Sequence, residues 1–291
     1  MSKNMVGIIA GSGLGDALAE HINNAENLSM NTPFGSPSDQ IITGTIAETP
    51  VAFLNRHGKG HILSPGCVPF AANIFALKEL GVTAIIASGA VGSLREDIRP
   101  GHLVIADQII DKTFRRKGSF FDQLGAVHCE LAQPFCSRLR GALIKTAQNL
   151  EMTVHPKGTY VCMEGPQFST RAESLMHRIW GGDLIGMTAM PEARLAREAQ
   201  ICYALVTMPS DYDCWKPHEE NKEKQTLIRE IIVNLQAATD NAVKLIKAVL
   251  LSGTRLCTDN CPCRKSLELA VWTSPDRIDP EMKKQLQILF E

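Results

Sequence analysis

Short apolar runs alternate with amphipathic stretches along most of the chain. The runs are typical of buried strands, which we predict at Val6–Ala10, Val51–Leu54, Thr83–Ala87, Leu103–Ala106, Tyr160–Cys162 and Ile201–Met208. Helical spacing of apolar residues predicts a helix at Ala72–Leu80, which stops at Gly81, and a long helix at Glu219–Leu251. Strands that alternate with helices indicate an α/β layer fold around a largely parallel sheet.

The pattern changes after residue 251. Ser252 and Gly253 end the long helix, and a segment with three cysteines leads to a short amphipathic end at Pro280–Glu291. We therefore divide the chain into a main domain at residues 1–251 and a Cys-containing C-terminal extension at residues 252–291, packed on or beside the core.

Composition narrows the class of protein. The 30 Lys and Arg nearly balance the 31 Asp and Glu, so charge gives no reason to expect nucleic acid or an anionic membrane as a partner. No apolar run reaches the roughly 18 residues that a membrane span needs, and the N-terminal segment is a poor secretion signal. The nine cysteines are odd in number and spread along the chain, which is typical of a reduced, cytoplasmic protein.

Three clusters of glycine or polar residues follow predicted strands. The turn Gly11–Gly13 could form a dinucleotide loop, but Asp16 stands where that fingerprint has its last glycine; the turn could instead bind a single phosphate or no ligand. Arg56 could bind an oxyanion with His57 as a second donor, or both could lie in a solvated basic turn. In such sheets the functional residues lie in loops at the carboxyl ends of strands. These groups and Gly89–Ala90 could therefore converge on one phosphate.

Two further polar segments carry candidate chemistry. The loop Glu164–Arg171 contains Phe168, whose ring either lies beside a ligand or folds into the core. Asp211 and Asp213 follow an apolar strand, and both point to the same side if the strand continues. Such a pair can raise the pKa of one partner and keep it protonated near neutrality; the alternative is a pair of turn or capping aspartates.

The extension carries Cys257, Cys261 and Cys263 within seven residues. Structural zinc takes four ligands, usually as two pairs, and neither Cys nor His follows Cys263. Free thiols, a redox or disulfide pair, and a metal site all stay open as interpretations. Of these three interpretations we favour the two without a metal, and we predict that no metal is bound.

Several segments together resemble the methylthioadenosine phosphorylase branch of the trimeric purine nucleoside phosphorylases. They run in family order from about residue 5 to residue 250: GIIAGSGLGD, TPFGSPSD, RHGKGH, ANIFALKELG, GAVGSLREDIRPG, QPFC, EGPQFSTRAES, IGMTAMPEARLAREA, ICYALVTMPSDYDCW and HEE at 218–220. The resemblance implies a single α/β domain with a mixed central sheet and a distorted barrel flanked by helices. It also implies a homotrimer or a dimer of trimers.

The reaction implied by this resemblance is phosphorolysis. Inorganic phosphate would cleave S-methyl-5'-thioadenosine to adenine and 5-methylthioribose 1-phosphate, a step of purine and methionine salvage, with adenosine as a further candidate substrate. Phosphate would be a co-substrate, and the reaction would use no metal or organic cofactor. The glycosidic bond would break early, and Asp211 would protonate the leaving purine as a general acid.

Carried over residue by residue, the resemblance assigns eleven residues to the site. The phosphate would be bound by Ser12, Arg56, His57, Thr188 and the backbone of Ala90. The nucleoside would contact Met187 at the ribose, Phe168 at the base, Asp211 and Asp213 at the N7 and 6-amino edge, and His128 with Val233 at the 5' group. Asp211 and Asp213 are the predicted catalytic residues, and spacing alone does not say which of them is nearer to N7.

The chain departs from the family pattern at three places. Ser12 stands where the family often has Thr, and Ser88 and Gly89 stand where many members have paired threonines, so one hydroxyl to phosphate is missing. Gly186 replaces a common Asn, which makes this segment look more like the general purine nucleoside phosphorylases.

Two alternative functions follow from these features. A 6-oxopurine nucleoside or methylthioinosine phosphorylase is favoured by Gly186 and opposed by the aspartate pair. A redox-sensing binding protein on the same scaffold would use the thiols of the extension, because some family members carry a Cys-x-Cys near their end as a disulfide or redox element.

Overall fold

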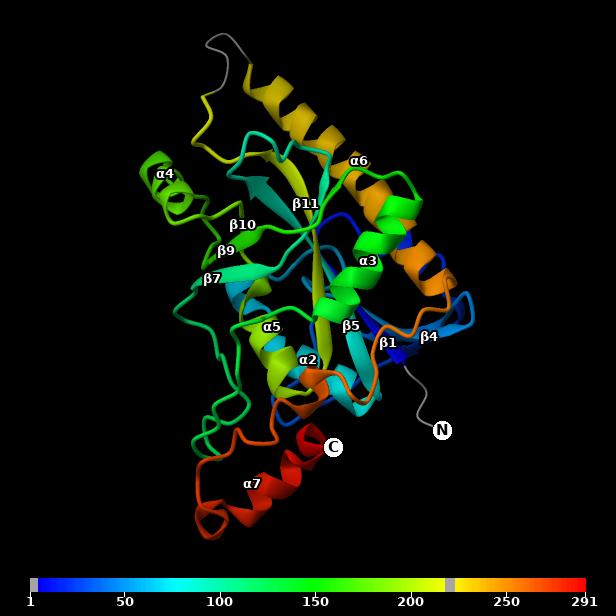
Figure 1. Ribbon diagram of the computed structural model, residues 1–291, viewed down its shortest axis with the longest axis vertical. Coiled ribbons are helices and arrows are strands. Elements are labelled where there is room, and N and C mark those ends of the chain that lie inside the picture. The colour runs from blue at the N-terminus through cyan, green and yellow to red at the C-terminus, as the bar shows by residue number, and fades with distance from the viewer. Residues whose placement is uncertain (1–4, 218–222) are drawn as a thin grey trace.

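One mixed sheet runs through the molecule, with helices on both of its faces (Figure 1). The computed structural model describes residues 5–217 and 223–291, so the HEE segment at 218–220 lies outside the described residues. The strands are β1 Met5–Ala10, β2 Asn23–Leu28, β3 Ile41–Ile46, β4 Thr49–Asn55, β5 Val82–Ser93, β6 Leu103–Ile105, β7 Gln108–Lys112, β8 Val154–His155, β9 Thr159–Met163, β10 Leu184–Gly186 and β11 Cys202–Tyr212. The α-helices are α1 Gly15–Ala19, α2 Phe70–Glu79, α3 Ser137–Asn149, α4 Arg171–Ile179, α5 Ala189–Glu198, α6 Lys224–Leu251 and α7 Pro280–Gln285.

Four short 3-10 helices complete the described elements: η1 Pro65–Cys67, η2 Pro262–Lys265, η3 Pro275–Arg277 and η4 Gln287–Phe290. No α-helix in residues 5–217 and 223–291 is both long enough and apolar enough to cross a membrane.

The long strand β5 is the branch point of the sheet. It pairs in parallel with β1 on one side and with β11 on the other, and its last residues pair antiparallel with β10. One branch continues from β1 through β4 and β3 to the edge strand β2. The other two continue through β10, β9 and β7 and through β11, β6 and β8. The strand pairings of the described residues thus give a branched sheet, and the distorted barrel stays a prediction.

Alternate residues of the central strands face two separate cores. Ile85 and Leu205 belong to the core beneath α2 and α5, whereas Ile86 and Val206 belong to the core beneath α1, α3 and α6. Because both faces of these strands are buried, their sequences read as nearly continuous apolar runs, which is why the pattern finds them so readily. The fold class is therefore the predicted one, a mixed sheet between two layers of helices.

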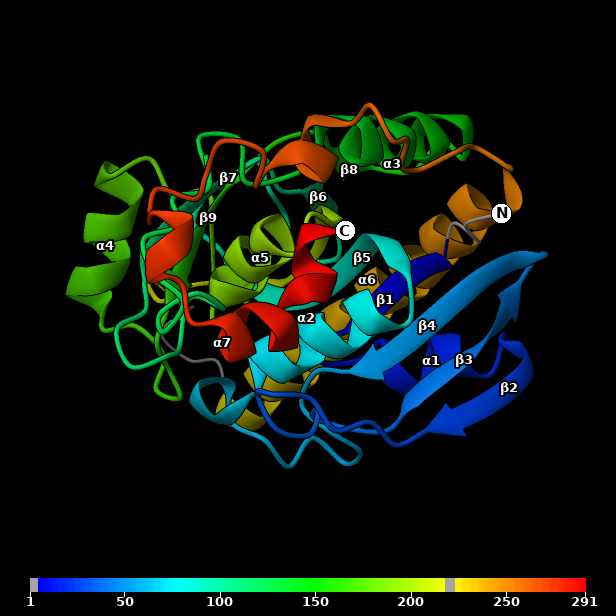
Figure 2. The ribbon, with the colours of Figure 1, turned by 90° about the horizontal axis from the view of Figure 1, so that it is seen from below.

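Residues 252–291 pack against both cores. Leu256 and Cys261 join the core of α3 and α6, and Leu286 and Leu289 join the core of α2 and α5. The last 3-10 helix, η4, contacts α2, and Figure 2, seen from below, shows the red C-terminal segment in front of α2. Within the described residues the extension thus touches both helical layers, although it contains little regular structure of its own.

Three elements differ from the sequence-based expectation. The polar strand β2 is an exposed edge, so it lacks the apolar run that reveals a buried strand. Two strands are longer than predicted: β5 continues through the small residues after Ala87, and β11 continues through Asp211 to Tyr212. In both cases the strand pairing includes candidate site residues, namely Ala90 on β5 and Asp211 on β11. Among the described residues, six of the ten strand pairs are parallel and four are antiparallel, so the sheet is mixed with a parallel majority.

Candidate active site

A cavity of about 560 Å³ opens where β1, β4, β5, β10 and β11 end. Nine of the eleven predicted site residues line it: Ser12, Arg56, His57, Ala90, Phe168, Met187, Thr188, Asp211 and Asp213. These residues come from six separate segments of the chain. The expectation that strand ends converge on one site therefore agrees with the geometry, although the role of each residue remains a prediction.

The glycine turn after β1 is packed tightly against its neighbours. The N–H of Gly11 donates to Ser88 Oγ at 3.1 Å, and a Cβ on Gly11 would lie 2.6 Å from the Ser88 carbonyl oxygen. Gly13 has a φ of +91°, a backbone conformation that favours glycine. Backbone packing of this kind leaves Ser12 at the cavity wall, where its hydroxyl can face an anion.

Arg56 is completely buried and paired with Glu192. Its Nε and Nη2 donate to the two Glu192 carboxylate oxygens at 2.7 and 2.8 Å, and its Nη1 donates to the Ser88 carbonyl at 2.7 Å. Burial acts to lower the pKa of Arg56, but the charge and hydrogen bonds of Glu192 outweigh it and raise that pKa. A guanidinium has five N–H groups, so one on each of Nη1 and Nη2 remains for an anion in the cavity.

His57 has its Nδ1 2.8 Å from the Leu63 carbonyl oxygen, and its ring stacks on His61. Burial lowers the pKa of His57 to about 4; the Leu63 carbonyl opposes this shift, and the charge of Arg56 reinforces it. The ring is therefore neutral near pH 7, with its proton on Nδ1 and a bare Nε2. This corrects the expectation of a second donor, because a bare Nε2 accepts a hydrogen bond, for example from a P–OH group.

Thr188 follows β10 and is buried at the cavity wall, where its backbone N–H donates to Tyr160 Oη at 3.3 Å. The same tyrosine explains Gly186. A Cβ at that position would lie 2.6 Å from Tyr160 Cζ, so a larger residue would displace the ring. Packing against Tyr160 thus accounts for Gly186, which removes it as an argument for a 6-oxopurine substrate.

The two aspartates line the cavity at the end of β11. Asp211 accepts a hydrogen bond from Ser210 Oγ at 2.9 Å. Asp213 is held by its backbone N–H, which donates to the Ser93 carbonyl at 3.0 Å, and its Oδ2 is buried without a hydrogen-bond partner in the described part of the chain. A buried carboxylate oxygen is normally paired. Asp213 therefore offers an acceptor to a donor on a bound molecule.

The loop before α4 places Phe168 at the cavity mouth, where 82% of its surface is exposed. The ring is therefore not folded into the core, which answers the question that the sequence left open. Thr170 and Glu173 form a reciprocal capping box that fixes the start of α4. At the other end of the loop, Glu164 accepts from the Phe114 N–H at 2.8 Å.

Sequence reasoning missed the residues that hold the site together. Glu192 pairs with Arg56 and accepts from Tyr203 Oη at 2.8 Å. Arg116 donates to the carbonyls of Glu164 and Met187, each at 2.6 Å, and so ties the Phe168 loop to the segment after β10. Glu192 lies inside the recognised IGMTAMPEARLAREA segment and could have been flagged as a buried acid that needs a cation. Arg116 sits in an ordinary basic run that gives no signal.

Two predicted residues do not line the cavity. The backbone N–H of His128 donates to Ala270 in the extension, and its ring packs edge-on against Trp272. Val233 is 65% exposed on α6, whereas Ile231 and Leu235 of the same helix face the cavity. The latter two are four residues apart and share a face, and Val233 lies between them on the opposite side.

The comparisons with known proteins agree with one another. Residues 5–251 match the phosphorylase superfamily. The chain is similar to the S-methyl-5'-thioadenosine phosphorylases of Cereibacter sphaeroides, at 46% identity over 98% of this chain and 96% of that protein, and of Geobacter sulfurreducens, at 42% identity over 99% and 98%.

Solved structures extend this agreement to the fold. A methylthioadenosine phosphorylase from an antarctic soil metagenomic library gives a TM-score of 0.88 at 41% identity, with 98% of both chains covered. The methylthioadenosine phosphorylase of Schistosoma mansoni in complex with tubercidin gives 0.81 at 35% identity, over 90% of this chain and 96% of that one. The chain therefore belongs to the phosphorylase superfamily and, within it, to the methylthioadenosine phosphorylase family.

Proposed function

We propose that this chain catalyses the phosphorolysis of S-methyl-5'-thioadenosine to adenine and 5-methylthioribose 1-phosphate, with adenosine as a secondary substrate. The main observation is that one cavity contains both candidate anion-binding groups and a buried carboxylate oxygen, Asp213 Oδ2, for which the described residues supply no donor. Phosphate and a purine with an N–H edge meet these two requirements together. The names of the similar proteins support the same reaction.

The phosphate end consists of the Ser12 hydroxyl, the two free N–H groups of Arg56, the backbone of Ala90, and Thr188. Because Glu192 neutralises most of the charge of Arg56, binding depends on directed hydrogen bonds more than on net charge. The bare Nε2 of His57 accepts a hydrogen bond from the P–OH group of a monoprotonated phosphate. Phosphate is then held with an oxygen aimed at C1' of the ribose, below the bond that breaks.

The base end consists of Phe168 against the purine, with Asp211 and Asp213 at its N7 and 6-amino edge. As the C1'–N9 bond breaks, the ribosyl group becomes oxocarbenium-like and a phosphate oxygen bonds to C1'. The electron pair of the broken bond goes to the purine. Protonated Asp211 donates to N7, and ionised Asp213 accepts from the 6-amino group; positioned general acid catalysis contributes about 10²–10⁴-fold.

The reaction needs phosphate as its co-substrate and no further cofactor, and it needs neither nucleic acid nor a membrane. We place the protein in the cytoplasm, because its nine cysteines are all unpaired. We also treat residues 252–291 as an extension of the 1–251 phosphorylase domain, since their buried side chains join its two cores.

A homotrimer or a dimer of trimers is the proposed assembly. Large apolar side chains lie exposed near the Phe168 loop, with Phe114 77% and Ile179 85% accessible. Surfaces of this kind are typical of interfaces. Since His128 lies outside the cavity of its own chain, it can act on the 5' group only in the cavity of a neighbouring copy.

One experiment tests the function and its alternatives together. The folded protein is incubated with phosphate and, separately, methylthioadenosine, adenosine, inosine or methylthioinosine, and the released base is identified. We expect adenine, released fastest from methylthioadenosine and only when phosphate is present. Faster release of hypoxanthine would favour the 6-oxopurine alternative. The absence of any phosphate-dependent release would favour a non-catalytic, redox-sensing protein.

A further inference from the structure

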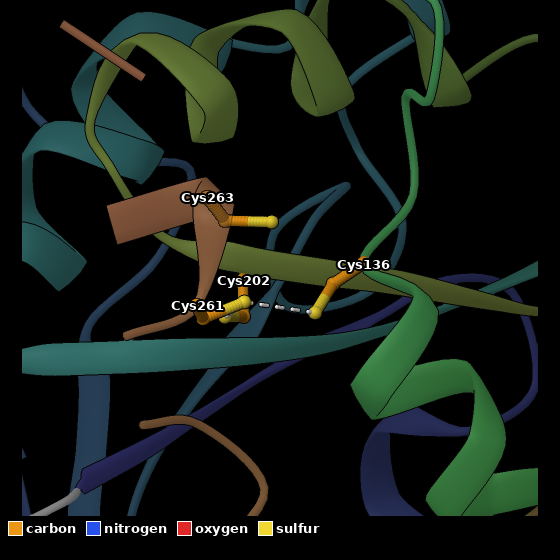
Figure 3. A group of neighbouring side chains, drawn as sticks. All are labelled: Cys136, Cys202, Cys261 and Cys263. Carbon is orange, nitrogen blue, oxygen red and sulfur yellow. Dashed lines mark hydrogen bonds between the residues drawn. The ribbon is translucent and has the colours of Figure 1, made fainter. Parts of the chain in front are cut away.

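Four buried thiols from three distant segments lie close together on the face of the sheet that α3 and α6 cover (Figure 3). Cys136 lies just before α3, Cys202 begins β11, and Cys261 and Cys263 flank Pro262 at the start of η2. All four Sγ atoms lie within 4.8 Å of one another, and all four residues are buried. In the described residues this is the one group of three or more Cys, His, Asp or Glu side chains with the spacing of metal ligands.

The sulfur separations match a shared ion. Cys136 Sγ lies 3.6 Å from Cys261 Sγ, and Cys202 Sγ lies 3.4 Å from Cys261 Sγ. A disulfide needs about 2.05 Å, so these are unbonded thiols. Zinc–sulfur bonds of about 2.3 Å place the corners of a thiolate tetrahedron about 3.8 Å apart. Both separations lie within about 0.4 Å of that spacing, and no two of the four sulfurs are more than 4.8 Å apart, so modest side-chain movements would let them surround one ion.

The backbone already holds the ligands in place. Cys136 donates its N–H to the Tyr203 carbonyl at 2.8 Å, which ties the start of α3 to β11 beside Cys202. Cys261 is fixed by two turn bonds, from its own N–H to Thr258 and from the Arg264 N–H to its carbonyl, at 2.9 and 2.8 Å.

One full and one partial positive charge lie close to this group of thiols. Cys136 occupies the N-cap of α3, so the positive end of that helix faces its sulfur. Arg264 donates to the Gln200 carbonyl at 2.9 Å, which holds its guanidinium beside the strand that carries Cys202. A tetrathiolate with a divalent cation carries two negative charges, which these groups partly offset.

We propose that Cys136, Cys202, Cys261 and Cys263 bind one zinc ion. Binding releases four thiol protons to solvent and forms four Zn–S bonds, with no change of oxidation state. Four thiolates favour zinc over the harder divalent cations, and a closed set of four protein ligands is typical of a structural site. None of the four lines the active-site cavity, so the ion fastens the extension to the core and takes no part in phosphorolysis.

The sequence shows three cysteines close together in the extension. The folded chain instead brings together a different set of four. Cys257 lies 3.2 Å from Cys202 but is outside the group whose four sulfurs are mutually close. Cys136 and Cys202, far away in sequence, complete the site instead. This replaces the expectation of no metal with a specific ligand set.

The first test measures bound metal. Protein without an affinity tag is purified with a phosphine reductant, and its zinc content is determined by plasma mass spectrometry. We expect about one zinc per chain in the wild type, and a loss of at least about tenfold in Cys136→Ser and Cys263→Ser. Cys67→Ser and Cys129→Ser, which lie outside the cluster, serve as controls and keep their zinc. Equal zinc content in all four variants would overturn the proposal.

A second test uses only the wild type, in case the cluster variants fail to fold. Metal-free, fully reduced protein is titrated with Co²⁺ and followed by absorption. We expect a thiolate-to-cobalt charge-transfer band and tetrahedral d–d bands that saturate at one equivalent and disappear on addition of Zn²⁺. If the folded, reduced protein takes up neither ion, the proposal is wrong. In that case, a mass lower by two hydrogens per bridge under non-reducing conditions would assign disulfides instead.

Discussion

At the scale of single residues, the most informative atom of the cavity is Asp213 Oδ2, which has no hydrogen-bond partner within residues 5–217 and 223–291. An ionised carboxylate accepts hydrogen bonds and cannot donate them, so it suits a 6-amino group and repels a 6-oxo group. The amide of an asparagine could offer its NH₂ to the 6-oxo group. We therefore expect substrate choice to depend on the chemical nature of this one side chain.

We predict that Asp213→Asn shifts the ratio of kcat/KM toward inosine-type substrates by roughly tenfold to a hundredfold, since an unpaired buried polar group costs about 1–3 kcal/mol. Asp211→Asn should instead lower kcat on methylthioadenosine by about 10²–10⁴-fold, because an amide cannot transfer the proton. Steady-state kinetics on methylthioadenosine and methylthioinosine distinguish the two effects. An unchanged ratio in Asp213→Asn would contradict the adenine-reading role, and exchanged phenotypes would exchange the two assignments.

Arg56 and Glu192 form a buried ion pair, so we expect substitutions there to change both stability and the proposed phosphate binding. Arg56→Lys keeps the charge but loses the paired contacts, and we expect its KM for phosphate to rise by roughly tenfold to a hundredfold while the KM for nucleoside changes little. Arg56→Ala should also lower the free energy of unfolding by about 3–5 kcal/mol, because it leaves Glu192 buried and uncompensated. Tyr203→Phe is the control: it removes one hydrogen bond to Glu192 and leaves the ion pair intact. A phosphate KM unaffected in Arg56→Lys would argue against the anion site.

His57 links stability to pH. Its pKa is about 4 in the folded chain and 6.5 in the unfolded chain, so on acidification the unfolded state takes up the proton first. The contribution of His57 is therefore present above pH 6.5 and is lost as the pH falls from 6.5 toward 4. Between about pH 7 and about pH 5 we expect this loss to be roughly 1 kcal/mol, after allowance for solvent around a ring that is not fully enclosed. Urea unfolding of the wild type and His57→Gln at both pH values measures it, and the variant should lose less stability on acidification. Parallel behaviour of the two proteins would refute the assignment.

At the scale of elements, the close packing of β10 against β9 predicts a coupling between Gly186 and Tyr160. Gly186→Ala places a Cβ against the tyrosine ring, and such overpacking typically costs about 1–3 kcal/mol. Tyr160→Leu removes the ring, so in that background Gly186→Ala should cost clearly less. Chemical denaturation of both single variants and the double variant completes the cycle. Strict additivity of the two changes would mean that the ring does not exclude a side chain at residue 186.

The elements also show what sequence patterns can and cannot predict. Strands buried on both faces, such as β1 and β11, produce long apolar runs, so the pattern located them. The edge strand β2 has no such run, and α3 buries only a narrow stripe of Leu139, Leu143 and Ala147, so neither was predicted. The strand-end rule and the resemblance together gathered most of the cavity. Partners such as Glu192 were not predicted, because Glu192 and Arg56 are 136 residues apart and such a pair leaves no local pattern in the sequence.

At the scale of the whole molecule, the extension contacts both helical layers. Bound zinc would also link it to Cys136 and Cys202 of the core through metal–sulfur bonds. Removal of the metal by a chelator should therefore lower the melting temperature by more than about 5 °C. Activity at room temperature should persist in the fraction that stays folded, since no cluster residue lines the cavity. Scanning calorimetry and an activity assay on the same samples, with and without added zinc, measure the two effects. An unchanged melting temperature would show that the extension is secured by apolar packing alone.

The branch point at β5 has a consequence for how the site responds to its substrates. The strand begins deep between β1 and β11, and a few residues later its backbone at Gly89, Ala90 and Gly92 forms the cavity wall. Amides in such a central strand exchange with solvent only when large parts of the domain open. We therefore expect the wall proposed to face phosphate to be as rigid as the core itself and to lose little conformational entropy when an anion binds. The motion that admits and releases the nucleoside is then expected at the rim of the cavity where the exposed Phe168 lies.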